Sequence, residues 1–224
     1  MKPTVVSYPD LSSAPKDASL FSVSIPGAST IYGRIWHLDL CLVEVRLMQN
    51  KTQVSLSIPK IPSQILQACR DFFTWVSREH QRSEACVILY YSPHAASWLA
   101  FAPTQAVNQE NVHWEIDEEI PQGFYYAGSI HSHVLLKPYH SQTDINDEIA
   151  WDGFHIVTNL FGEFVASIVV SGFHFSVSIT DIAEVPEQKF PLDWQAKVTF
   201  DPTLPDPLDR QGLYERLKSW FHIK

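Results

Sequence analysis

The chain has 224 residues, of which 45% are hydrophobic, and it carries a formal net charge of −9. This length accommodates one large domain with an extension, and the apolar content excludes wholesale disorder. The acidic balance disfavours a polyanionic partner, so we expect no binding of nucleic acid.

Cysteine usage and hydropathy favour a cytoplasmic location. Cys41, Cys69 and Cys86 are sparse, odd in number and without CxxC spacing. This pattern predicts free buried thiols in a reducing compartment. The segment 1–20 has no apolar run of the signal-peptide kind, and no stretch reaches about 18 apolar residues. We therefore expect neither a transmembrane helix nor a membrane partner.

Residues 1–60 predict an N-terminal β-rich extension. A lead-in rich in Ser, Pro, Ala and Asp covers residues 1–19. Strands are predicted over 21–25 and 30–36. Apolar residues at every second position over 41–58 predict a β-hairpin with one buried face. The extension is expected to pack on the domain that follows, and a role as a substrate platform is the alternative.

A second region, residues 61–185, is predicted to begin with an amphipathic helix. Pro62 suits the first turn of a helix. The apolar residues that follow at helical spacing are Ile65, Leu66, Cys69, Phe72, Phe73 and Val76. Glu84 then opens an apolar strand that ends at Tyr91. The next expected elements are a hairpin partner, a polar loop and another strand, over 98–101, 103–111 and 112–116.

Two histidines follow a strand predicted over 125–130. His131 and His133 are two positions apart, so on a strand their side chains point to the same face. Ser141 and Asp144 follow, which completes the pattern His-x-His-x7-Ser-x2-Asp. Two imidazoles and one carboxylate are a common ligand set for a catalytic zinc. We therefore predict a Zn2+ site at His131, His133 and Asp144.

The same residues allow a simpler interpretation. The run from Ser141 to Asp144 has the form of a helix N-terminus, with a hydroxyl at the N-cap and an acid three residues on. In that interpretation Asp144 is only a capping residue. His-x-His alone would then be weak evidence for a metal.

The spaced pattern resembles the JAMM motif of the JAB/MPN metalloprotease family. The residues that carry the resemblance are Gly128, His131, Ser132, His133, Ser141 and Asp144. The resemblance implies a cytidine-deaminase-like domain of the α+β class, in which both histidines and the aspartate hold Zn2+. It also implies that Ser141 stabilises an oxyanion during cleavage of a peptide or isopeptide bond, typically after ubiquitin or a ubiquitin-like protein.

The family also places its catalytic glutamate between a helix and a strand, and Glu84 lies at such a position. The resemblance therefore implies that Glu84 is the general base. By composition alone its rivals are Glu110, Glu115, Glu118 and Glu119. Two residues depart from the family pattern, since Val87 stands where relatives often have glycine and Val134 where they often have proline.

The elements after the motif complete the predicted domain. The helix should continue through 145–149, with Asp147 and Glu148 on a solvated face. The strands expected next cover 152–158, 164–170 and 174–179. His155 is expected to be a packed strand residue. The run 152–156 gives a looser likeness to the bacterial-type branch that includes PRTRC system protein A.

The C-terminal segment, residues 186–224, differs from the rest in composition. Prolines are frequent over 181–207, which predicts an irregular tail. The helically spaced apolar residues near the end predict a docked helix over 208–221. They are Leu213, Leu217, Trp220 and Phe221.

Three functions are compatible with these patterns. The expected one is a zinc-dependent peptidase or isopeptidase acting on a protein or peptide, for example a ubiquitin-like or sulfur-carrier protein. A non-catalytic MPN scaffold is the second, although inactive relatives have typically lost ligands that this chain retains. A cupin-like metalloenzyme is the third, but cupins need a glutamate shortly after His-x-His and a distant third histidine. The sequence leaves the oligomeric state open.

Overall fold

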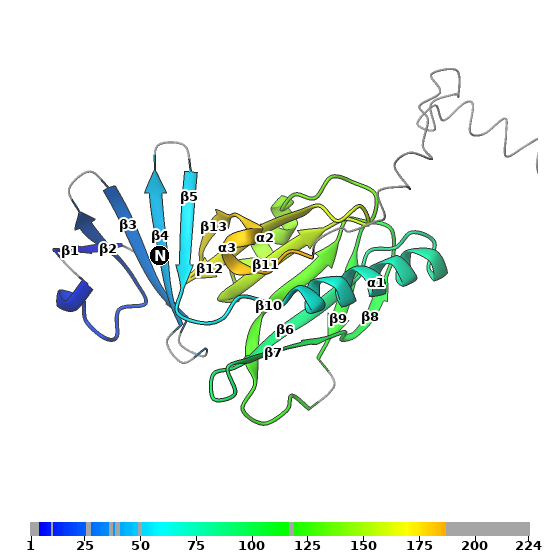
Figure 1. The fold of residues 1–224 in the computed structure, drawn as a ribbon. Coiled ribbons are helices and arrows are strands. Elements are labelled where there is room, and N and C mark those ends of the chain that lie inside the picture. Colours follow the sequence, from blue (N-terminus) through cyan, green and yellow to red (C-terminus); the bar gives the residue numbers. More distant parts are fainter. Residues whose placement is uncertain are drawn as a thin grey trace, which may run out of the picture. The chain divides into compact units, whose positions relative to one another are not determined.

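The computed structural model describes residues 5–9, 11–25, 28–35, 38, 41–48, 51–116 and 119–186 (Figure 1). The helix predicted over 208–221 lies outside the described residues. The described part is mixed α and β, with few helices and several sheets, which agrees with the predicted α+β class. Within it, no helix combines the length and the apolar character needed to cross a bilayer.

A five-stranded sheet forms the N-terminal part, and its strands follow one another in chain order. The strands are β1 (Val6–Tyr8), β2 (Leu20–Ile25), β3 (Ala28–Ile35), β4 (Cys41–Met48) and β5 (Lys51–Leu56). A short 3-10 helix, η1 (Leu11–Ser13), lies between the first two. β1 pairs in parallel with β2, and all later pairs are antiparallel. The predicted strands and the predicted hairpin are confirmed.

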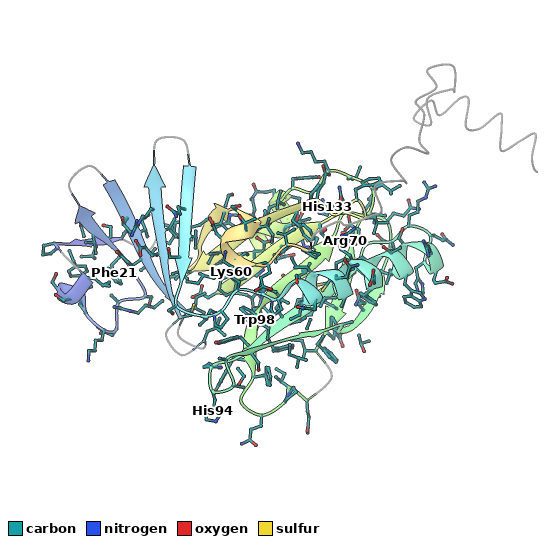
Figure 2. The ribbon with its side chains drawn as sticks, in the orientation of Figure 1. Phe21, Lys60, Arg70, His94, Trp98 and His133 are labelled. Carbon is teal, nitrogen blue, oxygen red and sulfur yellow. The ribbon has the colours of Figure 1, made fainter. Side chains whose placement is uncertain are left out.

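The two faces of this sheet enter different apolar clusters. On β4, Cys41, Val43 and Val45 are buried in the main core of the protein. Phe21, labelled in Figure 2, stacks on Tyr32 with ring centroids 5.5 Å apart in a separate small cluster. Each fully buried apolar side chain of this size contributes roughly 1.5–3 kcal/mol, so both faces add to stability.

A six-stranded sheet forms the centre of the remaining part, with the order β13-β12-β11-β10-β6-β7. Its strands are β6 (Cys86–Ser92), β7 (Ser97–Phe101), β10 (Tyr125–Ser132), β11 (Gly153–Thr158), β12 (Phe164–Val170) and β13 (Phe173–Val177). Only β10 and β11 are parallel; the other neighbours are antiparallel. β6 and β11 are buried along their whole length, as their apolar sequences predict.

The parallel pair explains two features of the motif region. Parallel neighbours need a crossover connection, and here it contains α2 (Gln142–Glu148). Gly128 has φ of +144°, and a Cβ there would lie 1.8 Å from the carbonyl oxygen of Phe154 on β11. The motif glycine is therefore required for the close approach of β10 and β11.

Three further elements complete this part. The helix α1 (Ser63–Glu79) buries Leu66, Cys69, Phe73 and Val76 in the main core, as its periodicity predicts. The prediction of a loop over 103–111 is wrong in part, because β8 (Thr104–Val107) pairs with β9 (Val112–Glu115). Cross-strand pairing stabilises β8 although its sequence alternates only weakly. The short helix α3 (Ile179–Ile182) precedes a backbone bridge between Ile61 and Ala183.

The N-terminal sheet packs on the central sheet. A Cβ on Gly33 of β3 would lie 2.9 Å from side-chain atoms of Val170 on β12. The backbone N–H of Val54 on β5 also donates to the carboxylate of Asp181 in α3. These contacts agree with the structural role expected for the extension.

Candidate metal centre

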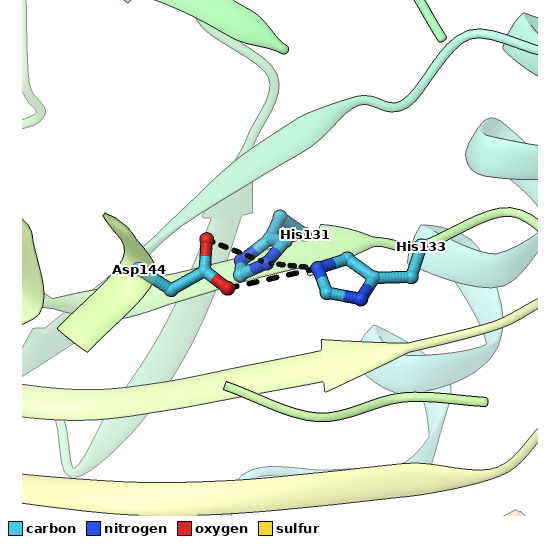
Figure 3. Close-up of side chains that lie close together, drawn as sticks. All are labelled: His131, His133 and Asp144. Atoms are coloured by element: carbon cyan, nitrogen blue, oxygen red, sulfur yellow. Dashed lines mark hydrogen bonds and ion pairs between the residues drawn. The ribbon is translucent and has the colours of Figure 1, made fainter. Parts of the chain in front are cut away.

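The end of β10 presents both motif histidines on one side. His131 is in the strand, and His133 follows it with its backbone N–H donated to the carbonyl of Thr158 on β11. Between them Ser132 is buried on the opposite face, and its hydroxyl oxygen accepts from the N–H of Ala85. As a result the Nε2 atoms of His131 and His133 lie 3.3 Å apart (Figure 3). The predicted convergence of the two rings is confirmed.

Asp144 reaches the same point from the first turn of α2. Its Oδ1 lies 3.5 Å from Nε2 of His131, and its Oδ2 lies 3.6 Å from Nε2 of His133 (Figure 3). Asp144 also completes a capping box with Ser141: each residue's side chain accepts the backbone N–H of the other, at 2.7 and 3.1 Å. The predicted capping role of this aspartate is therefore confirmed, and the same capping box fixes the carboxylate that faces the histidines.

The spacing of these three groups fits a small cation. Ligand atoms at the corners of a tetrahedron around Zn2+, with bonds of ~2.0–2.2 Å, lie roughly 3.3–3.6 Å apart. The three separations, 3.3, 3.5 and 3.6 Å, fall in that range. Two unprotonated imidazole nitrogens and a carboxylate facing one another also repel, so a cation or shared protons must compensate. The donor set therefore fits a divalent metal ion.

Burial strengthens the repulsion among these three groups, because little solvent screens it. The side chains of His133, His131 and Asp144 are 7%, 16% and 20% exposed. Burial alone would raise the pKa of Asp144, but its interactions with His131, His133 and Ser141 hold that pKa well below the usual range. Asp144 is thus a carboxylate across the physiological range.

The ring of His133 is held by packing. The ring of Tyr139 meets it edge-on, with centroids 5.0 Å apart. Its Nδ1 is buried and has no hydrogen-bond partner among the described residues. Packing rather than a hydrogen bond at Nδ1 therefore orients this ring.

Glu84 lies on the wall of the same cavity, two residues before the start of β6. The cavity has a volume of about 660 Å³ and is also lined by His131, His133 and Asp144. The Glu84 N–H donates to the carbonyl of Asn108. Burial raises the pKa of Glu84, and the nearby His133 and His131 oppose part of this rise. The structure thus brings Glu84 into electrostatic reach of the three clustered residues.

The structure distinguishes the other glutamates that were candidates for the general base. Glu110 lines the same cavity and raises the pKa of Glu84 by its charge. Glu115 and Glu119 are exposed and do not line this cavity. Glu118 lies outside the described residues. Glu110 is therefore the one structurally placed rival within the described part of the chain.

Ser141 contributes a hydroxyl group to the wall of the cavity. Its hydroxyl oxygen accepts the N–H of Asp144 at 3.1 Å, which uses one lone pair. A hydroxyl has one O–H and two lone pairs, so this contact does not use the O–H, and the same side chain also interacts with the Asp144 carboxylate and helps to lower its pKa. Ser141 lines the cavity beside Asp144.

The loop after His133 differs from what a proline would allow. Val134 has φ of +49° and is buried, whereas proline fixes φ near −65°. Such a conformation costs a β-branched residue of order 1–3 kcal/mol and tends to occur at functional sites. Val134 therefore has a backbone conformation that a proline at this position could not adopt.

The cysteines are free and buried, as predicted. Burial raises the pKa of Cys69 and of Cys86 to about 12, and that of Cys41 to about 11. Cys86 lines the cavity, but its thiol stays protonated at neutral pH. A cysteine nucleophile is therefore disfavoured.

A second group of histidines and a carboxylate lies at the other end of α2. Asp147 is exposed, as predicted, but the prediction of a solvated Glu148 is wrong, because Glu148 is only 5% exposed. Its carboxylate lies between His140 and His174. His140 directly precedes the motif serine, but His174 is distant in sequence and no local spacing connects it to this group.

Comparison with known proteins adds no family assignment, since neither the protein-family models nor the curated proteins gave a match.

Proposed function

We propose that the chain is a zinc-dependent peptidase or isopeptidase of the JAMM type, with a domain of the JAB/MPN fold. One observation carries this proposal. The side chains of His131, His133 and Asp144 converge at 3.3–3.6 Å from a strand and a helix. In this proposal these three residues are the ligands of Zn2+.

The ion, when bound, would act as a Lewis acid on the scissile carbonyl and lower the pKa of a water molecule. Glu84 would accept a proton from that water at its carboxylate and pass it to the leaving amine. Ser141 would donate its O–H to the developing oxyanion, and loss of such a donor typically costs about 10²–10³ in rate. Asp144 would remain a carboxylate throughout.

The environment of Glu84 supports its role as a proton carrier. General acid–base catalysis is most efficient when the pKa of the group lies near the working pH. Burial moves the pKa of Glu84 upward, toward that range, while His133 and His131 limit the rise. Glu84 is not part of the three-residue cluster, so it is available for the proton.

The substrate proposed is a protein or peptide, for example a fusion to a ubiquitin-like or sulfur-carrier protein. Aromatic and apolar side chains line part of the cavity, among them Trp114, Trp151 and Leu136. These side chains are exposed by 36%, 56% and 62%, which gives an extended chain apolar surface to contact. Among the described residues of the N-terminal sheet, none lines the cavity, so the cavity gives no support to the substrate-platform alternative.

The two other functions have less support. A scaffold needs no convergent ligand set, whereas here the three side chains are preorganised by strand geometry and a capping box. A cupin is a double sheet of the jelly-roll type, whereas here the third candidate ligand comes from a helix. The candidate site sits on a mixed sheet with one parallel pair.

A cleavage screen tests the proposal. The zinc-loaded protein is incubated with a panel of fusions to ubiquitin-like and sulfur-carrier proteins, and mass spectrometry identifies any new termini. We expect cleavage that a chelator abolishes and added Zn2+ restores. Cleavage that is unaffected by the chelator and by His131→Ala would refute the metal-dependent mechanism.

A further inference from the structure

The carboxylate of Glu148 is held by three donors from three segments of the chain. Its Oε1 lies 2.9 Å from Nδ1 of His140, and its Oε2 lies 2.9 Å from Nε2 of His174 on β13. The hydroxyl of Ser167 on β12 donates to the same Oε2 at 3.0 Å. Glu148 is buried, so its two oxygens depend on these protein donors.

The protonation of this group is determined by its geometry. A carboxylate can only accept hydrogen bonds, so His140 must carry its proton on Nδ1 and His174 on Nε2. Burial alone would raise the pKa of Glu148, but the hydrogen bonds from the two histidines lower it to about 2. The group is therefore a charged acceptor surrounded by donors, which is the arrangement of a strong buried hydrogen-bond network.

This network joins the two ends of α2. His140 directly precedes Ser141, the N-cap, and Glu148 is the last residue of the helix. The contact between His140 and Glu148 therefore spans the whole helix, while Ser167 and His174 connect its end to the sheet. Asp144 lies one turn before Glu148 on the same short helix. A seven-residue helix is marginal on its own and depends on tertiary contacts.

We infer that Glu148 is a positioning residue, which holds α2 against β12 and β13 so that Asp144 meets His131 and His133. This inference rests on the proposed metal site. Loss of the network would let the helix shift and would weaken a metal ligand without removing it. Partners of this kind, one step away from the ligands, typically contribute about 10–100-fold to metal affinity.

The alternative of a second metal site fits the distances less well. Nitrogen–oxygen separations of 2.9 Å are those of hydrogen bonds. They are shorter than the roughly 3.3–3.6 Å between ligands of a tetrahedral zinc. Both histidines would also have to lose the protons that now hold the carboxylate.

The test measures metal affinity rather than turnover. Metal-free protein is titrated with Co2+, whose visible absorption reports coordination, and then with Zn2+ in competition. His174→Ala removes a donor to Glu148, whereas His174→Gln keeps an amide N–H near the position of Nε2. Ser167→Ala removes the smaller donor with little change in volume. The exposed Glu184→Gln is the control, and circular dichroism shows that each variant is folded.

We expect His174→Ala to raise the Kd for Zn2+ about tenfold, and His174→Gln to restore it to within about twofold of the wild type. Ser167→Ala should raise the Kd about two- to threefold, and it decides the matter if His174→Ala does not fold. Unchanged affinity in the folded donor variants would overturn the inference. Uptake of two ions by the wild type and one by His174→Ala would also overturn it, in favour of a second metal site. Failure of the proposed function is distinct, because then His131→Ala would bind metal as well as the wild type does.

Discussion

The two ends of α2 carry clusters built from the same residue types, two histidines and one carboxylate. At the first end, His131, His133 and Asp144 are separated by 3.3, 3.5 and 3.6 Å. At the second end, Glu148 lies 2.9 Å from each of its two histidine partners. The first spacing fits ligands around a metal ion, and the second fits direct hydrogen bonds.

The difference arises from how each carboxylate is satisfied. Asp144 has one oxygen occupied by the backbone N–H of Ser141, and both oxygens face histidine nitrogens beyond hydrogen-bond distance. Glu148 instead receives a hydrogen bond from a hydroxyl and from both imidazoles. The first cluster is thus short of positive charge, whereas the carboxylate of the second cluster is satisfied by three hydrogen bonds. Ligand residue types alone do not define a metal site, since distances and proton positions decide the outcome.

Removal of one histidine from the first cluster should have the largest effect. We expect wild-type protein to hold about one Zn2+ per chain and His131→Ala to hold almost none, with complete loss of any metal-dependent cleavage. Elemental analysis of the purified proteins measures this. His94→Ala, in the exposed turn after β6 (Figure 2), is the matched control and should keep its zinc. Equal zinc in His131→Ala and wild type would refute the ligand assignment.

Much of the first cluster could be predicted because its geometry is local. The two-residue period of a strand places His131 and His133 on one face. Helix-capping chemistry places Asp144 at the first turn of α2. The strands β6 and β11 could also be predicted, because strands buried on both faces have largely continuous apolar sequences.

The second cluster could not be predicted, because it depends on tertiary contacts between distant segments. Glu148 follows the exposed Asp147, and nothing in the local sequence indicates that His174 on β13 lies beside it. The strand β8 was missed for a similar reason, since its pairing with β9 stabilises it. The positive φ of Val134 is likewise imposed by its surroundings, against the preference of a β-branched residue.

Glu84→Gln should separate chemistry from metal binding within the first cluster. The amide is nearly isosteric but cannot take up a proton, so the rate should fall by about 10²–10⁴ while zinc content stays unchanged. Asp144→Asn should differ, because a weakened ligand lowers zinc occupancy as well as rate. Turnover and zinc content are measured together on any substrate that the wild type cleaves.

The same substitution on the surface, Glu184→Gln, controls for the loss of one negative charge. If Glu84→Gln retains full activity, another acid is the base. Glu110 would then be the residue to test, because it lines the same cavity.

The ionisation of Glu148 in the second cluster should make the free energy of unfolding depend on pH. The pKa of Glu148 is lowered from 4.5 to about 2 in the folded protein, so the unfolded chain binds the proton more readily. Its contribution, up to about 3 kcal/mol, is present above the unfolded pKa and is lost as the pH falls toward 2.

Denaturant unfolding of metal-free protein measures this contribution. Glu148→Gln should be less stable than wild type near neutral pH, and the difference should shrink from about pH 5 to about pH 3. Asp144 titrates in the same direction, but it is present in both proteins and cancels in the comparison. A difference that stays constant over this range would show that the charge of Glu148 does not stabilise the fold.

The smallest effect is expected for the thiols. Cys86 lines the cavity that contains the first cluster, yet burial raises its pKa to about 12. Because the thiolate is the reactive form, a thiol-alkylating reagent applied to the folded protein should leave cleavage unchanged. A zinc chelator should abolish it. Mass spectrometry before and after unfolding verifies that the three cysteines are protected only in the folded state. If alkylation abolished cleavage and the chelator spared it, the chemistry would belong to a cysteine, and the spacing of His131, His133 and Asp144 would need another explanation.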